Sequence, residues 1–125
     1  MRPNIHIEDM VSSYICVLEV PKQKVQGEIF NVGYDNHTVL ELGQMVKEIV
    51  GRKRPVELMV ERTNDNRSYH VSSKKIAEKL GFSPRHTIRN AVEDLVEAFD
   101  SGRLPNAMDD DRYINIKTMK ALNLK

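Results

Sequence analysis

The chain has 125 residues, of which 40% are hydrophobic and 30% charged, and 19 basic against 18 acidic residues give a net charge of +1. This length suits one small domain, while the balanced charge and short apolar runs argue against nucleic-acid binding, a polybasic membrane anchor and a membrane span. The N-terminus lacks the apolar core of a signal peptide and the single Cys16 permits no internal disulfide, so a cytoplasmic protein is expected.

The first third of the chain predicts an extended piece, a helix and a strand. A short extended segment at 4–7 precedes a helix over 8–20, where apolar residues recur at helical spacing. Pro21 ends this helix because proline lacks the N–H that the next turn needs. The β-rich stretch 28–32 lies between two glycines and predicts a strand.

The strongest helix signal lies at 38–50. Thr38 and Glu41 match the capping box, in which loss of the capping side chain costs about 1 kcal/mol. One face of the segment is apolar, and Gly51 provides the C-terminal stop. The partly alternating stretch 56–60 then predicts a further strand.

The second half of the chain predicts two more helices. One covers 74–80 and ends at Gly81, and the other covers 88–101 after Thr87 as its cap. Beyond residue 104 no periodic pattern is evident. The order of these segments predicts an α/β fold with few short strands and about four helices.

Motifs that carry chemistry by themselves are not found in the sequence. The six glycines form no phosphate-binding loop, and the four histidines lack metal-ligand spacing. Tyr113 and Lys117 are four residues apart, so on a helix the lysine would lie on the same face as the tyrosine and could activate it. Such a pair recurs by chance, however, and this one lies near the C-terminus. We therefore predict no catalytic, cofactor-binding or metal-binding residue in this chain.

Residues 71–92 imitate a DNA-binding helix-turn-helix unit. A short helix with Ala77 leads through Gly81 to a second helix carrying Arg89. However, the position ten residues after Ala77, where such units bury an aliphatic side chain, is Thr87. The acidic residues of the second helix would also repel phosphate. DNA binding is therefore the weaker alternative.

Three segments, read together, carry a resemblance to a known family. Residues 2–9 (RPNIHIED) are similar to R-x-x-I-H-V-x-D, and residues 27–33 (GEIFNVG) to G-x-x-(Y/F)-N-(V/L/I)-G. Residues 62–67 (RTNDNR) and 80–84 (LGFSP) are similar to R-x-x-D-x-R and L-G-(W/F)-x-P. In this order they resemble the C-terminal, substrate-binding part of extended short-chain dehydrogenases/reductases, the NAD-dependent nucleotide-sugar epimerases and dehydratases.

The resemblance implies that this chain is one part of a longer enzyme and that the two parts have different functions. Residues 1–103 would be the substrate-binding lobe with the last elements of a Rossmann-type fold, and 104–125 a C-terminal tail. The enzyme would be about twice this length, and its N-terminal half would hold the NAD or NADP loop and the catalytic Ser/Thr, Tyr and Lys. This chain alone is then expected to bind no cofactor and to be inactive.

The resemblance also implies which residues hold the nucleotide-diphosphate sugar. Arg2 and Arg62 would bind the diphosphate, which the planar guanidinium fork suits. Asp65 would take the ribose, and Asn31 would orient the phosphates or the adjacent loop. Arg67 is either a third phosphate contact or a partner of Asp65.

Three origins of so short a chain stay open. It is a fragment of an epimerase or dehydratase, one piece of a split gene, or a stand-alone, non-catalytic binding module of the same fold. The apolar faces at 8–20, 28–32 and 38–50 pack on the cofactor domain in the family. Without the missing N-terminal half they would be exposed or covered by self-association.

Overall fold

The structure is a computed structural model that describes residues 1–61 and 68–123. It divides into two compact units, Met1–Asp94 and Leu95–Lys125. Among the described residues, no helix combines the length and apolar character needed to cross a membrane.

The described chain is a mixed α/β structure. In chain order the first unit contains β1 (Arg2–Asn4), α1 (Ile7–Glu19), α2 (Lys22–Val25), β2 (Asp35–His37), α3 (Val39–Gly51) and α4 (Lys74–Leu80). Helix α5 (Ile88–Asp100) begins in the first unit and continues into the second. The second unit also contains the 3-10 helix η1 (Asp111–Tyr113) and helix α6 (Asn115–Ala121).

The helices predicted from local signals are confirmed within a residue or two. Predictions at 8–20, 38–50, 74–80 and 88–101 correspond to α1, α3, α4 and α5. The capping box of α3 is present, because Thr38 Oγ1 accepts from the N–H of Glu41 at 3.1 Å and Glu41 Oε2 accepts from the N–H of Thr38 at 2.6 Å. The short helices α2 and α6 have weaker sequence patterns and were not predicted.

The predicted strands are mostly wrong. In the part of the chain that the structure describes, the sheet has two antiparallel strands, with Arg2 paired with His37 and Asn4 with Asp35. The second of them, β2, was not predicted. Residues 28–32 and 56–60 form no strand in the structure. A strand needs a neighbour that supplies a ladder of backbone hydrogen bonds, which β-propensity alone does not provide.

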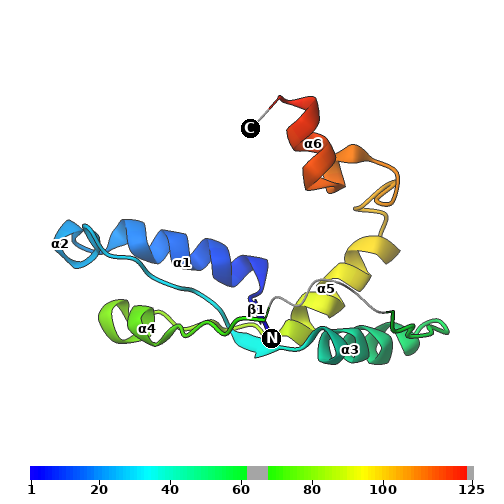
Figure 1. Cartoon of the computed structure of the whole chain (residues 1–125), viewed down its shortest axis with the longest axis horizontal. Coiled ribbons are helices and arrows are strands. Elements are labelled where there is room, and N and C mark those ends of the chain that lie inside the picture. The colour runs from blue at the N-terminus through cyan, green and yellow to red at the C-terminus, as the bar shows by residue number, and fades with distance from the viewer. Residues whose placement is uncertain (62–67, 124–125) are drawn as a thin grey trace. The chain divides into compact units, whose positions relative to one another are not determined.

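Side chains, not a neighbouring strand, hold the extended segment 28–33. The Ser73 hydroxyl accepts from the N–H of Gly33 and donates to its carbonyl oxygen, both at 2.8 Å. The Lys75 ammonium donates to the carbonyl oxygen of Ile29 at 2.8 Å. The segment thereby runs between α1 and α4 in the first unit (Figure 1).

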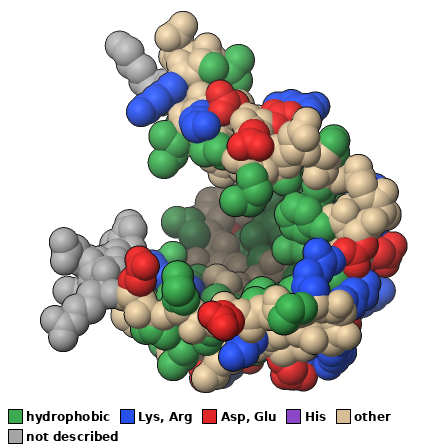
Figure 2. Space-filling view, turned by 90° about the vertical axis from the view of Figure 1, so that its right-hand side faces the viewer, with side chains coloured by type: hydrophobic (Ala, Val, Ile, Leu, Met, Phe, Trp, Pro, Cys, Tyr) green, Lys and Arg blue, Asp and Glu red, His purple; other side chains and the backbone are tan. Residues whose placement is uncertain are grey.

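Much apolar surface stays uncovered. The buried hydrophobic side chains of the described residues are Ile49, Ile76, Phe82 and Ile88. The chain exposes 9990 Å², whereas two separate compact bodies of these two sizes would together expose only about 8,000 Å². Figure 2 accordingly shows hydrophobic side chains at the surface among charged ones.

The clearest uncovered stripe runs along α1. Ile7, Val11, Tyr14 and Leu18 follow one another at helical i, i+4, i+7 spacing and are 50–83% exposed. Val39 and Leu40 on α3 are also exposed, as is Ile29. The faces that the sequence predicts to need a partner therefore lack one within the described first unit.

Replacing Thr38 with alanine is expected to lower the free energy of unfolding by about 1 kcal/mol, because the capping hydroxyl of α3 is lost. Urea denaturation followed by far-UV circular dichroism measures this change. Thr38→Ser keeps the hydroxyl and is the matched control, with an expected loss well below that of Thr38→Ala. Equal losses in the two variants would show that the hydroxyl contributes nothing.

Candidate functional site

Of the residues predicted to bind nucleotide, the structure describes Arg2 and Asn31. Arg2 lies on β1, and its guanidinium carbon is 5.7 Å from the centroid of the Tyr69 ring. Three other predicted residues, Arg62, Asp65 and Arg67, lie outside the described residues.

The chain that follows these three residues lies against the start of β1. The N–H of Tyr69 donates to the carbonyl oxygen of Met1 at 3.3 Å, and the Met1 amine donates to Ser68 Oγ at 2.6 Å. Tyr69 comes only two residues after Arg67 in the sequence. The residue before Arg2 is therefore bonded to Ser68 and Tyr69, which follow the R-x-x-D-x-R motif directly in the sequence.

Asn31 borders a largely apolar pocket of about 430 Å³ beneath α1. The pocket is lined by Pro3, Met10, Ser13, Tyr14, Val17, Phe30, Asn31, Val32, Val71 and Ile76. Pro3 follows Arg2 directly, and the N–H of Tyr34 donates to the carbonyl oxygen of Asn4 at 2.7 Å. The segments that carry Arg2 and Asn31 are thus joined, although Arg2 itself does not line the pocket.

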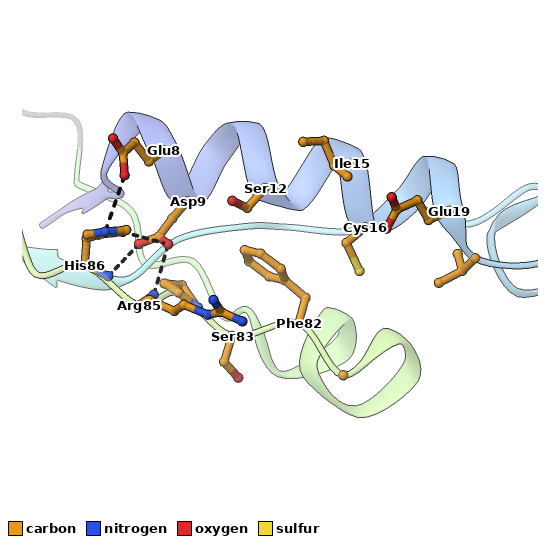
Figure 3. Close-up of a pocket in the computed structure, with 13 residues that line it drawn as sticks. Glu8, Asp9, Ser12, Ile15, Cys16, Glu19, Phe82, Ser83, Arg85 and His86 are labelled. Carbon is orange, nitrogen blue, oxygen red and sulfur yellow. Dashed lines mark hydrogen bonds and ion pairs between the residues drawn. The ribbon is translucent and has the colours of Figure 1, made fainter.

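A second site, which sequence reasoning missed, is a groove between α1 and the loop 81–86 (Figure 3). Its volume is about 780 Å³, and it is lined by Glu8, Asp9, Ser12, Ile15, Cys16, Glu19, Val20, Gly81, Phe82, Ser83, Pro84, Arg85 and His86. Charged groups gather at the end nearest the start of α1, where dashed lines in Figure 3 join Asp9 to Arg85 and His86. Of the two predicted nucleotide-binding residues that the structure describes, neither Arg2 nor Asn31 lines this groove.

Asp9 is the buried acceptor at this end of the groove. Its carboxylate accepts from the N–H of Arg85 at 3.0 Å, from the N–H of His86 at 2.8 Å and from His86 Nδ1 at 3.1 Å. Burial by itself would raise the pKa of Asp9, but these bonds and the nearby imidazole outweigh it and lower the pKa below the usual 3.8. Asp9 therefore fixes α1 to the loop that precedes α5.

His6 joins the start of α1 both to this loop and to α5. Its Nδ1 accepts from the N–H of Glu8 at 3.2 Å, which caps α1, and its Nε2 lies 3.0 Å from Asp94 Oδ2 on α5. The His6 ring stacks on the His86 ring with centroids 4.6 Å apart. His86 Nε2 in turn lies 3.4 Å from Glu8 Oε2. His6, Glu8 and His86 are the described residues whose atoms could together hold a metal ion.

The connection between α4 and α5 differs from that of a DNA-binding helix pair. Seven residues, 81–87, separate the two helices, whereas helix-turn-helix units use a turn of about 3–4 residues. The backbone of Arg85 and His86 is bound to Asp9. These features argue against the DNA-binding alternative.

Comparison with curated proteins finds nucleotide-sugar epimerases. The chain is 33% identical over 96 residues to a UDP-glucose 4-epimerase of Corynebacterium glutamicum, a match that covers 75% of this chain and 29% of that protein. It is 25% identical over 96 residues to the UDP-glucose 4-epimerase of Homo sapiens (76% of this chain, 28% of that protein). It is 25% identical over 100 residues to the CDP-paratose 2-epimerase of Salmonella typhi (78% and 29%).

The chain spans less than a third of the length of each of these relatives. No protein-family model matches it, and no solved structure matches it significantly. The similarity at 25–33% identity supports a relation to the epimerase family.

Proposed function

We propose that this chain is the nucleotide-sugar-binding, C-terminal portion of an NAD-dependent epimerase or dehydratase. The observation that carries the proposal is the 33% identity to a UDP-glucose 4-epimerase over 96 residues. That match and the three motifs support the same family. Residues 1–103 would form the binding lobe, and 104–125 its C-terminal tail.

In this proposal, arginines bind the diphosphate of the substrate. Arg2 and Arg62 supply guanidinium groups, whose paired N–H donors match the oxygens of a phosphate. Asp65 binds the ribose, Asn31 orients the phosphates or the adjacent loop, and Arg67 contacts a phosphate or Asp65. The contact between Tyr69 and Met1 supports this assignment, because Tyr69 lies two residues after the Arg62 motif in the sequence and Met1 precedes Arg2.

The redox chemistry belongs to the part of the enzyme that lies outside this chain. NAD or NADP bound there would exchange hydride with the sugar, and this chain would hold the non-reacting nucleotide. Binding energy from such a remote group positions the reacting sugar. The chain alone is inactive in this proposal, and the missing N-terminal half would cover the exposed face of α1.

Arg62→Ala is expected to weaken binding of UDP-glucose by about ten-fold to a hundred-fold, since a charge-assisted hydrogen bond contributes about 1.5–3 kcal/mol. Isothermal titration calorimetry of the chain with UDP-glucose and with a CDP-sugar measures this loss. Arg103→Ala removes an arginine that bonds Glu97 in the second unit, so it is the matched control and should leave affinity unchanged.

Two outcomes would contradict the proposal. Equal weakening in Arg62→Ala and Arg103→Ala would mean that the Arg62 motif does not contact the nucleotide. An absence of binding to any nucleotide sugar would instead favour a stand-alone interaction module of the same fold.

A further inference from the structure

Two imidazoles and a carboxylate converge at the start of α1. His6, Glu8 and His86 each place a nitrogen or oxygen atom within 4.8 Å of the atoms of the other two. His6 is the N-cap of α1, Glu8 lies in its first turn, and His86 lies two residues before α5. The ends of two helices therefore fix the positions of all three backbones.

Each imidazole is oriented by a second carboxylate. His86 Nδ1 lies 3.1 Å from Asp9 Oδ1, and His6 Nε2 lies 3.0 Å from Asp94 Oδ2. Histidines that bind metals commonly donate their other ring N–H to a carboxylate in this way. The arrangement leaves Nε2 of His86 and Nδ1 of His6 as the nitrogens with a lone pair.

Either a proton or a metal ion can bridge His86 and Glu8. When the proton of neutral His86 is on Nδ1 toward Asp9, its Nε2 lone pair faces Glu8 Oε2 at 3.4 Å. Two electron-rich atoms repel one another unless a proton or a metal ion lies between them. Two ligands of a tetrahedral Zn²⁺ ion lie about 3.3 Å apart, given metal–ligand distances of about 2.0–2.1 Å.

The geometry points to a site for a divalent transition-metal ion such as Zn²⁺, with His6 Nδ1, His86 Nε2 and the Glu8 carboxylate as its ligands. Nitrogen and carboxylate ligands in this ratio suit Zn²⁺ better than Mg²⁺ or Ca²⁺, which prefer oxygen ligands alone. The carboxylates of Glu8, Asp9 and Asp94 lie beside the two imidazoles, and a divalent ion would offset part of their negative charge. Three protein ligands leave a fourth position for water.

Ion binding requires one hydrogen bond to be exchanged and one of the two stacked rings to turn, because the lone pairs lie in ring planes that are only 29° apart. His6 Nδ1 accepts from the N–H of Glu8 at 3.2 Å and would turn its lone pair to the ion. The Glu8 side chain is 68% exposed, so solvent can reach this turn and accept from the released N–H. The groove of Figure 3, which Glu8 and His86 both line, gives the ion a path from solvent.

The test is titration of the complete chain, freed of metal with a chelator, with ZnCl₂ by isothermal titration calorimetry near neutral pH. We expect one ion per chain, and Co²⁺ in its place should give the visible absorption of a tetrahedral site. Glu8→Gln and His86→Gln should each weaken Zn²⁺ binding at least ten-fold. His70→Gln, at an exposed histidine outside the cluster, is the control and should leave binding unchanged.

The proposal fails if the metal-free chain shows no saturable Zn²⁺ binding, which would leave a proton as the cation between His86 and Glu8. It also fails if both Glu8→Gln and His86→Gln bind as tightly as the unmodified chain. Circular dichroism checks that each variant is folded. Glu8→Gln changes an exposed side chain and keeps the test decisive if His86→Gln disturbs the fold.

Discussion

Asp9→Ala is expected to lower the free energy of unfolding by about 3–5 kcal/mol. Asp9 is 2% exposed, and its carboxylate accepts hydrogen bonds from the backbone of Arg85 and His86 and from the His86 ring. Hydrogen bonds to a charged group contribute about 1.5–3 kcal/mol each. Removing the acceptor also leaves two backbone N–H groups without a hydrogen-bond partner. Urea denaturation at neutral pH, followed by circular dichroism, measures the loss.

The control and the pH dependence make this prediction specific. Asp109→Ala, at an exposed aspartate in the second unit, should change stability by no more than about 0.5 kcal/mol. Because the pKa of Asp9 is lowered in the folded chain, its stabilising effect is present above the usual value of 3.8 and is lost as pH falls through the folded pKa. The difference between Asp9→Ala and the unmodified chain should therefore narrow in acid. A difference that stays constant down to strongly acidic pH would contradict this account.

Ile76→Ala is expected to destabilise the first unit by about 3 kcal/mol. Ile76 on α4 is 0% exposed, the most deeply buried of the described hydrophobic side chains. Shortening it removes apolar contacts and leaves a cavity, for which such substitutions cost about 2–5 kcal/mol. Few of the described side chains are buried, so Ile76 contributes a large share of the described core. The same urea titration measures the effect.

Ile29 offers a matched control for this substitution. It is 82% exposed, so Ile29→Ala removes the same atoms from a site that buries little of them. Its expected effect is within about 0.5 kcal/mol. Comparable losses in Ile29→Ala and Ile76→Ala would show that the first unit does not pack around α4 as described.

The helices were predictable because their signals are local. Thr38 and Glu41 bond one another within a single turn. Gly81 ends α4 with a φ of 72°, a conformation that glycine adopts readily. Strand formation depends on a partner elsewhere in the chain, and the stretch 28–32 has strand composition but pairs with no strand among the described residues. For this reason, composition alone was misleading there.

The candidate sites show the same contrast between local motifs and long-range contacts. Arg2 and Asn31 belong to short motifs and were found from the sequence, whereas the cluster around Asp9 was not. His86 is 77 positions from Asp9, and neither the spacing of the histidines nor their neighbours predicts that they meet. One sequence feature could have indicated the cluster: His6 immediately precedes a helix, and Asp9 lies in the first turn of that helix.

The same long-range bonds bear on how the first unit folds. Asp94 is 88 positions from His6, and His86 is 77 from Asp9, so each bond closes a large loop. The entropy of loop closure opposes such contacts until many form together, and helices as short as α1 and α4 are only marginally stable before they dock. During synthesis from the N-terminus, α1 therefore emerges well before the loop that binds Asp9. Its docking waits until that distant loop has been made.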